Sequence, residues 1–440
     1  MSDVNLPHSW LWTTLGEICS RPQYGYTTKA ADSGDTLFLR TTDITSGKID
    51  WDTVPFCAEN PEDPDKYQLH DGDVVISRAG SVGFSHLIQS PPKAVFASYL
   101  IRFRPFIDRG YFAFFLKSPF YWHSISDRKS GIAVGNVNAQ KLAAISIPLP
   151  PLAEQKRIVA KIEELFSELE AGEESLRAAR RQLGVYRQSL LKQAFEGKLT
   201  EKWRTENPDK LEEWTSTTVG KIGRIETGTT PPTENQANYG GDLPFFKPTD
   251  LEQGRYVKDA RSYLSASGRQ SARVLPAGSI LVTCIGATIG KTGLAQLACA
   301  TNQQINSISP AEGIAPEFAY FQVISPQFQE QIKTNASSTT LPILNKSKFS
   351  AFPFVLCSLP EQQEIVRLLD EQFEAIERNE REIDAALKRS EALRQAILKK
   401  AFTGQLVAQD PADEPASALL ARLHAERGAT TQPGRSRRKV

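Results

Sequence analysis

An internal duplication constrains this chain of 440 residues more strongly than any other feature of its sequence. Glu-Gln-Lys-Arg-Ile-Val at 154–159 recurs 207 positions later as Glu-Gln-Gln-Glu-Ile-Val at 361–366. At the same offset Phe166 aligns with Phe373. A repeat of this length predicts that one folded unit, together with its connecting segment, occurs twice in the chain.

The segments before the repeated hexapeptide also correspond. Trp10 matches Trp214, and Arg40-Thr-Thr-Asp matches Lys247-Pro-Thr-Asp. We therefore expect five parts, which are a first head at 1–150, a helical segment at 151–210, a second head at 211–358, a helical segment at 359–407 and a mostly disordered tail at 408–440. The tail is rich in Ala, Pro, Asp and Gly, which disfavours a packed core, and a short helix near Ala416–Arg427 is the one element expected in it.

Both heads are expected to mix helices with many short strands. Apolar runs at 74–76 and 280–282 lie next to glycines and predict buried strands. Pro and Gly interrupt the remaining sequence of the heads at short intervals, as they do around turns. The predicted fold class is α+β, with two similar mixed α/β heads joined by long helices.

The two helical segments are expected to pack against each other. Pro150 and Pro151 suit the first turn of a helix, and Gly197 suits a C-terminal cap. Apolar residues at seven-residue spacing indicate a coiled-coil seam, formed by Ile158, Ile162, Leu165, Leu169, Leu176, Leu183 and Leu190 in the first segment and by Ile365, Leu369, Ile376, Ile383, Leu393 and Ile397 in the second. Because domain termini often lie close together, the second helix is expected to return antiparallel to the first, with an approximate two-fold relation between the heads.

The composition limits the classes of protein that the chain can belong to. The net charge is +1, so any nucleic-acid surface must come from a local arrangement of side chains. The five cysteines are scattered and never spaced as Cys-x-x-Cys, so we expect reduced thiols and no metal site. Neither a signal peptide nor a membrane span is expected, which favours the cytoplasm.

Sequence motifs for catalysis are incomplete. Gly-Ala-Thr-Ile-Gly-Lys-Thr at 286–292 follows an apolar run and resembles a phosphate-binding loop, but it has three residues between its glycines where the motif needs four. We expect a strand-to-strand turn there. The sequence contains no Asn/Asp-Pro-Pro-Tyr/Phe tetrad of amino-methyltransferases and no Gly-x-Ser-x-Gly elbow. We therefore expect no catalytic, cofactor or metal residues in this chain.

What remains is a set of polar side chains in the heads that could contact DNA. Asn and Gln can pair with adenine in the major groove, whereas Lys and Arg contact phosphates or guanine. The candidates are Tyr26, Thr28, Lys29, Arg40, Arg78, Arg102, Arg104 and Asn138 in the first head, and Thr230, Lys247, Thr249, Lys291, Asn302, Gln303, Gln304, Asn345 and Lys346 in the second. Each could equally be an ordinary surface or loop side chain, and a non-enzymatic coiled-coil scaffold with two ligand-binding heads is the alternative.

The duplicated motifs resemble those of specificity subunits of type I restriction–modification systems. Pro-Leu-Pro-Pro-Leu-Ala-Glu-Gln at 148–155 is similar to the start of the central conserved region of that family, and Leu-Pro-Glu-Gln-Gln at 359–363 is similar to its C-terminal counterpart. Ala-Phe-Glu-Gly at 194–197 and Ala-Phe-Thr-Gly at 401–404 are similar to the ends of these regions. The second region departs from the pattern because it lacks a second proline before Glu361.

The resemblance implies a DNA-binding, non-catalytic subunit that acts in DNA modification and host defence. Each head would be a target-recognition domain that reads one half of a bipartite, asymmetric site, and the antiparallel helices would set the gap between the halves. The partners would be double-stranded DNA, two adenine-N6 methyltransferase subunits and two restriction subunits. S-adenosylmethionine, ATP and Mg would belong to those partners.

Overall fold

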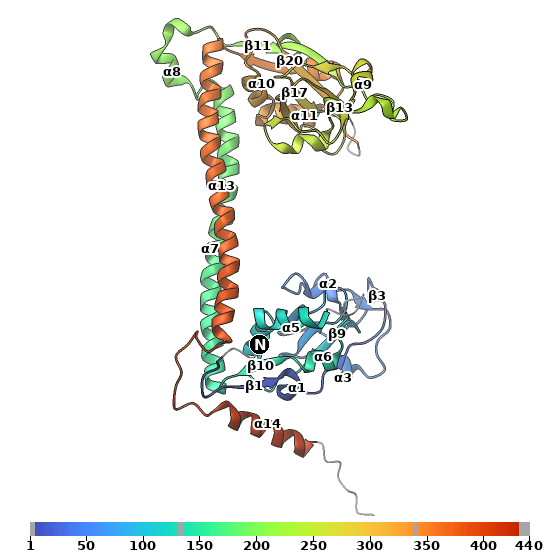
Figure 1. Cartoon of the computed structure of the whole chain (residues 1–440), viewed down its shortest axis with the longest axis vertical. Coiled ribbons are helices and arrows are strands. Elements are labelled where there is room, and N and C mark those ends of the chain that lie inside the picture. Colours follow the sequence, from blue (N-terminus) through green and yellow to red (C-terminus); the bar gives the residue numbers. More distant parts are fainter. Residues whose placement is uncertain (1–4, 130–135, 338–340, 431–440) are drawn as a thin grey trace, which may run out of the picture. The chain divides into compact units, whose positions relative to one another are not determined.

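The computed structural model describes residues 5–129, 136–337 and 341–430 (Figure 1). The chain forms two compact units, of which unit 1 comprises 1–175 with 385–440 and unit 2 comprises 176–384. Each unit contains one head and a section of both long helices, α7 (Leu152–Phe195) and α13 (Leu359–Ala401). The boundaries between the compact units therefore fall inside the helices.

The head of unit 1 (head 1) contains a two-stranded ribbon and two four-stranded sheets. The ribbon pairs β1 (Leu11–Thr14) with β10 (Ser146–Leu149). One sheet has the order β2 (Gln23–Tyr24), β9 (Leu100–Phe103), β6 (Val74–Ser77), β7 (Ser85–Leu87), and the other has the order β3 (Ala30–Ala31), β5 (Phe56–Cys57), β4 (Leu37–Leu39), β8 (Ala94–Phe96). The helices are α1 (Leu15–Ile18), α2 (Thr41–Ile44), α3 (Pro64–Tyr67), α4 (Arg109–Phe115), α5 (Pro119–Lys129) and α6 (Ala139–Ala143).

The head of unit 2 (head 2) repeats this plan. Its ribbon pairs β11 (Thr215–Thr218) with β21 (Pro353–Leu356). The two sheets have the orders β12 (Gly223–Thr227), β20 (Ile305–Pro310), β17 (Ile280–Thr283), β18 (Thr292–Ala295), β14 (Tyr256–Val257) and β15 (Tyr263–Leu264), β13 (Tyr239–Phe246), β19 (Cys299–Thr301), β16 (Val274–Leu275). The helices are α9 (Ala266–Ser271), α10 (Pro316–Val323), α11 (Pro326–Asn335) and α12 (Lys346–Ser350), with 3-10 turns η2 (Val219–Lys221), η3 (Gln236–Asn238) and η4 (Pro248–Gln253). The segment between α7 and head 2 contains α8 (Glu201–Glu206) and the 3-10 turn η1 (Pro208–Lys210).

The two strands predicted from apolar runs are confirmed, and each of them separates two hydrophobic cores. On β6, Val74 and Ile76 join one core while Val75 joins another, because successive side chains of a strand point to opposite faces. On β17 the alternate residues are divided between two cores in the same way. A strand buried on both faces is apolar along its length.

The glycine-rich segment after β17 connects two antiparallel strands. Gly286 and Gly290 both have positive φ, at 102° and 87°, which favours glycine. The chain then continues as β18, which pairs antiparallel with β17. The predicted strand-to-strand turn is confirmed, and a phosphate-binding loop is excluded because no helix follows the glycines.

The repeated Glu-Gln pair joins each head to the start of a long helix. In unit 1, Trp10 Nε1 donates to Glu154 Oε2 at 2.9 Å, and Gln409 Nε2 donates to Glu154 Oε1 at 2.6 Å. Gln155 Oε1 accepts a hydrogen bond from the backbone N–H of Asp108 at 3.0 Å. The carboxylate therefore connects the head, the helix and the chain that follows the helices.

The joint in unit 2 has the same design with different outer partners. Trp214 Nε1 donates to Glu361 Oε2 at 3.0 Å, while Thr200 Oγ1 and Arg204 Nη1 donate to Glu361 Oε1 at 2.7 and 3.0 Å. Gln362 Oε1 accepts from the backbone N–H of Ala315 at 2.9 Å. Both carboxylates are buried. The motif that revealed the duplication in the sequence thus has a structural role.

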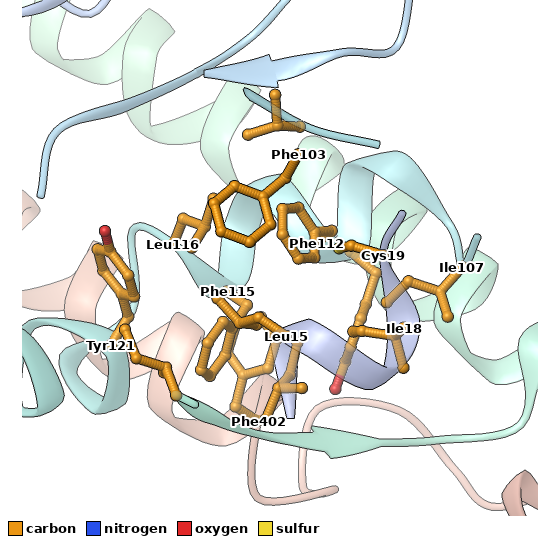
Figure 2. Close-up of a cluster of buried hydrophobic side chains, with 14 of the residues drawn as sticks. Leu15, Ile18, Cys19, Phe103, Ile107, Phe112, Phe115, Leu116, Tyr121 and Phe402 are labelled. Carbon is orange, nitrogen blue, oxygen red and sulfur yellow. The ribbon is translucent and has the colours of Figure 1, made fainter. Parts of the chain in front are cut away.

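The ends of the long helices also enter the head cores. In unit 1, the ring of Phe402 lies 5.4 Å from that of Phe115 (Figure 2). It also lies 5.0 Å from the ring of Tyr111. In unit 2, the ring of Phe195 lies 5.4 Å from that of Phe318. Each head is therefore completed by residues from a helix that ends beside it.

Within each unit α7 and α13 run antiparallel, as predicted. Eight seam residues are buried, which are Ile158, Ile162, Leu190, Ile365, Leu369, Ile376, Ile383 and Ile397. Four are half-buried, which are Leu165, Leu169, Leu176 and Leu183. The seam in the structure thus confirms most of the predicted positions.

The prediction for Leu393 is wrong, because this side chain is 52% exposed. Its neighbour Arg394 has a side chain that is only 17% exposed and faces α7 instead. A strict seven-residue repeat drifts around a straight α-helix by about 20° per heptad, so four heptads after Ile365 the drift is about 80°. The face of α13 that packs against α7 therefore follows the period of a straight α-helix, so a strict seven-residue repeat leaves this face after four heptads.

The short helix expected near Ala416–Arg427 is confirmed, whereas the expectation of a mostly disordered tail does not hold for residues 408–430. Helix α14 (Ala416–Thr430) packs on head 1, with Ala416, Leu419 and Leu423 buried in the same core as α1. Arg427 Nη1 donates to the backbone O of Gly16 at 3.0 Å. The packing of this helix could not be predicted from the tail, because its partners lie in head 1. The basic sequence at 435–439 lies outside the described residues.

Helix α14 should contribute to the stability of unit 1. We expect Leu419→Ala to lower the free energy of unfolding by about 2–5 kcal/mol, because it leaves a cavity in a packed core. Ser417→Ala, on an exposed position of the same helix, should change it by less than about 0.5 kcal/mol. Urea unfolding followed by hydrogen exchange in each unit measures both effects. Equal stability of the two variants would contradict the packing role of α14.

Candidate nucleic-acid interface

A pair of parallel strands in head 2 brings predicted site residues together. Strands β13 and β19 pair in parallel, so their carboxyl ends lie at the same edge of the sheet. Lys247 follows β13 and Asn302 follows β19, and the backbone N–H of Asn302 donates to the carbonyl of Phe246 at 3.2 Å. Lys247 and Thr249 are both exposed at this edge.

The loop after β12 completes the same edge. Thr230 Oγ1 donates to Gln303 Oε1 at 2.5 Å, and Asn302 Nδ2 donates to Gln304 Oε1 at 2.8 Å. Gly228 permits this contact, because a Cβ there would lie 2.2 Å from the carbonyl oxygen of Asn302. We call Thr230, Lys247, Thr249, Asn302, Gln303 and Gln304 the head-2 loop cluster.

Head 1 builds the same framework from its own parallel pair. Strands β4 and β8 pair in parallel, and the backbone N–H of Ala97 donates to the carbonyl of Leu39 at 2.9 Å. Arg40 therefore follows β4 where Lys247 follows β13 in head 2. The turn after β8 also matches the turn after β19 in head 2. The backbone N–H of Leu100 donates to the carbonyl of Ala97, just as the backbone N–H of Ile305 donates to the carbonyl of Asn302.

An early loop and an arginine border this turn in head 1. Tyr26 exchanges backbone hydrogen bonds with Phe96 and Ser98, at 2.7 and 2.8 Å. Arg78 Nη1 donates to the carbonyl of Ser98 at 3.4 Å, and its guanidinium lies 5.1 Å from the ring centre of Tyr24. The head-1 loop cluster comprises Tyr24, Tyr26, Thr28, Lys29, Arg40, Arg78, Ser98 and Tyr99.

Tyr99 is a candidate that the sequence analysis missed. Tyr99 is 60% exposed, more than any other tyrosine among the exposed large side chains of the described residues. The matching backbone hydrogen bonds of the two heads place it at the position of Gln304. The offset between the heads is 205 at this turn, whereas it is 207 at the helices. A comparison of the turns before Leu100 and Ile305 would have found Tyr99 in the sequence.

Two predicted arginines of head 1 have structural partners. Arg102 is 4% exposed and donates to the carbonyl of Gln68 at 2.6 Å and to Asp73 at 3.4 Å. Burial lowers the pKa of Arg102, and Asp73 opposes that effect. The prediction of a DNA contact for Arg102 is therefore corrected, because its guanidinium is enclosed. Arg104 is ion-paired with the same Asp73 at 2.7 Å and is 42% exposed.

Three of the other predicted residues already have partners, and a fourth is exposed. The side-chain oxygens of Asn138 and Asn345 cap helices α6 and α12 by accepting from Lys141 N and Lys348 N at 2.8 and 2.9 Å. Lys291 Nζ is ion-paired with Glu252 at 2.9 Å. Lys346 is exposed at the first position of α12.

The charge at the two clusters differs. Arg40 is ion-paired with Asp43 at 2.8 Å, and the hydrogen bond to that carboxylate raises the pKa of Arg40. Lys247 lies 5.8 Å from the ring centre of Phe245 and is exposed. Head 1 therefore presents tyrosines, Lys29 and Arg78 beside the ion-paired Arg40. Head 2 presents Lys247 and the amides of Gln303 and Gln304, whereas the predicted contact residue Asn302 is buried and hydrogen-bonded to Gln304. Such groups can hydrogen-bond to base edges and phosphates.

The cysteines of the described residues are enclosed in the heads. All five cysteines are buried, and burial raises the pKa of Cys57 to about 11 and that of Cys284 to about 12. Thiols with such pKa values stay protonated at neutral pH and are poor nucleophiles. Across 5–129, 136–337 and 341–430, His, Cys, Asp and Glu form no group of three or more that could hold a metal ion. In the same ranges, no helix is long and apolar enough to span a membrane.

Variants of head 2 should separate base contacts from phosphate contacts. Replacing Gln303 and Gln304 by Ala should cost about 1–3 kcal/mol per lost bidentate contact and relax the preference for one base. Lys247→Ala should instead weaken binding to all DNA sequences and flatten its salt dependence. DNA binding at several salt concentrations, measured on the assembled complex, distinguishes these effects. A folded double variant with wild-type affinity and sequence preference would remove the two glutamines from the interface.

The duplicated organisation agrees with known proteins. Residues 7–176 and 211–389 match the family model of the type I restriction modification DNA specificity domain. The chain is 28% identical over 476 aligned positions to the StySPI specificity subunit of Salmonella potsdam, with all of both chains covered. It is 26% identical over 470 positions to the EcoKI specificity subunit of Escherichia coli K12, again with full coverage of both.

Solved structures show the same fold. One chain from a study of complex assembly and conformational transition of the type I R-M system matches with a TM-score of 0.70 and 24% identity, over 91% of this chain and 100% of that one. The HsdS subunit from Thermoanaerobacter tengcongensis matches with a TM-score of 0.55 and 22% identity, over 92% and 99%. Because the family model matches both heads and the first part of each long helix, the chain belongs to the family of type I restriction–modification DNA specificity subunits.

Proposed function

We propose that this chain reads a bipartite, asymmetric DNA site, with one half-site for each head. The observation that carries the proposal is the pair of loop clusters, which share one backbone framework but differ in side chains. Ala-Ser-Tyr at 97–99 stands where head 2 has Asn-Gln-Gln at 302–304. Because base edges are distinguished by the donors and acceptors that meet them, different side chains on the same framework select different sequences.

The chain itself is proposed to be non-catalytic. In this proposal it acts in the cytoplasm as part of a complex with two methyltransferase subunits and two restriction subunits. The methyltransferases would hold S-adenosylmethionine and modify adenines that have left the base stack. The restriction subunits would use ATP and Mg. The names of the full-length relatives, which are specificity subunits of type I restriction enzymes, support this division of roles.

Exchanging one head should alter one half-site only. Residues 15–145 would be replaced by the matching segment of a related subunit that reads another sequence. This segment is bounded by β1 and β10, so the exchange keeps the contact between Trp10 and Glu154. Mapping of methylated adenines, with the chimaera assembled on its methyltransferase, is expected to show one new half-site and one unchanged half-site.

The reciprocal exchange of residues 219–352, bounded by β11 and β21, is the matched control. It should change the other half-site and leave the first one as it was. Independent reading by the two heads would be refuted by an active chimaera in which both half-sites change together. An active chimaera with both half-sites unchanged would refute the assignment of sequence reading to the heads.

A further inference from the structure

An arginine on α7 meets α13 through two kinds of contact in unit 2. Arg187 Nη2 donates to Glu380 Oε2 at 3.3 Å, and the Arg187 guanidinium lies 5.3 Å from the ring centre of Phe373. Phe373 in turn packs edge-on against Phe321 of α10, with ring centres 5.5 Å apart. The arginine is therefore connected both to the partner helix and, through the two rings, to the head.

The same arrangement occurs in unit 1 with the helices exchanged. Arg394 of α13 donates to Glu173 Oε1 of α7 at 3.3 Å and lies 5.0 Å from the ring centre of Phe166. Phe166 packs edge-on against Phe114 of α4, with ring centres 5.8 Å apart. Each member has its counterpart 207 positions away: Arg187 with Arg394, Glu173 with Glu380, Phe166 with Phe373, and Phe114 with Phe321. We call these two sets the arginine clamps.

The two clamps differ in burial. The side chains of Arg394 and Glu173 are 17% and 20% exposed, and Glu173 Oε1 also accepts from Ser390 Oγ at 2.7 Å. The side chains of Arg187 and Glu380 are 30% and 28% exposed. Arg187 also borders a cavity of about 520 Å³ in unit 2. The clamp of unit 1 is therefore the more enclosed, and the loss of its arginine should have the larger effect.

The two arginines lie where α7 and α13 pack against each other, so they can fix the register, that is, which turn of one helix lies beside which turn of the other. Leucine and isoleucine side chains pack in many alternative registers, since one apolar contact replaces another. An arginine in the seam does not, because a slide by one turn would break its pairing with Glu173 or Glu380 and its stacking on the phenylalanine ring together. Glu170, which lies 3.5 Å from Arg394, is 70% exposed and could replace the charge partner but not the enclosed contact. Polar seam residues specify register in helix pairs in this way.

We propose that Arg187 and Arg394 are positioning residues that lock the register of α7 against α13, and thereby fix the spacing between the two half-sites that the complex methylates. The second part of this inference rests on the proposed function. A third ion pair between the same helices, Arg180 with Asp384 at 2.9 Å, is 53% and 46% exposed and has no counterpart, since Leu387 stands 207 positions after Arg180. It provides a matched control.

The register is measured first on the full chain without DNA. Spin labels at the exposed positions Glu174 of α7 and Arg389 of α13 report the offset between the helices. The five native cysteines are buried, so labels attach to cysteines introduced at these two positions. The wild-type chain and Arg180→Met should give one narrow distance. The double variant Arg187→Met/Arg394→Met should give an added population, displaced along the helix by about one turn, or about 5.4 Å.

The spacing is measured next by methylation mapping of the complex assembled with its methyltransferase. The double variant should methylate the original half-sites at the original spacing and at spacings shorter or longer by about one or two base pairs, since about 3.4 Å separates successive base pairs. Arg394→Met alone should broaden the spacing more than Arg187→Met alone. Arg187→Lys/Arg394→Lys, which keeps the charge pairs, should largely restore the single spacing.

The outcomes separate the two parts of the account. A single wild-type label distance in the double variant would overturn the lock. If the double variant does not fold, Arg394→Met is scored by the same label distance, and a single distance there would overturn it as well. A displaced population with an unchanged methylation spacing would overturn the link to spacing. A wild-type complex that methylates no two-part site would contradict the proposed function and leave the label result on the lock standing.

Discussion

Two buried carboxylates, Glu154 and Glu361, hold this protein together at the places where heads and helices meet. A helix of 43 or 44 residues needs packing partners along its length, because isolated helices are marginal in water. Burial raises the pKa of Glu154, while hydrogen bonds from Trp10 and Gln409 oppose that effect. An enclosed carboxylate without such donors is costly, so the joint forms only when the head, the helix and the segment after the helices are all in place.

The joints explain how one framework can carry two different reading surfaces. Head 1 and head 2 are each attached through the ribbon, the tryptophan and the Glu-Gln pair, and the side chains of the loop clusters take no part in these contacts. Side chains such as Tyr99 and Gln304 can therefore differ without altering how the head meets its helices. This separation suits a protein whose reading specificity must change while its assembly stays constant.

The duplication, the long helices and the buried strands could be predicted because they depend on local pattern. The exposure of Leu393 does not follow from a strict heptad, because that repeat departs from the true helical period. The helix at 416–427 could be predicted, but its packing could not, because its partners lie in head 1, far away in sequence. Arg102 is enclosed by carbonyls and Asp73, which no local pattern reveals. Tyr99 was not aligned with Gln304, because corresponding residues of the two heads are 205 positions apart in these loops, whereas corresponding residues of the helices are 207 apart. The corresponding positions of the two loop clusters are therefore visible from the matching backbone hydrogen bonds of the two heads.

The most direct test of the central claim is a map of methylated adenines produced by the wild-type chain assembled with its methyltransferase. Two heads with one framework and unlike side chains should select two unlike half-sites, separated by a fixed number of unspecified bases. The map should therefore show one two-part, asymmetric motif. A single uninterrupted motif, or two identical half-sites in inverted orientation, would contradict independent reading by two different heads.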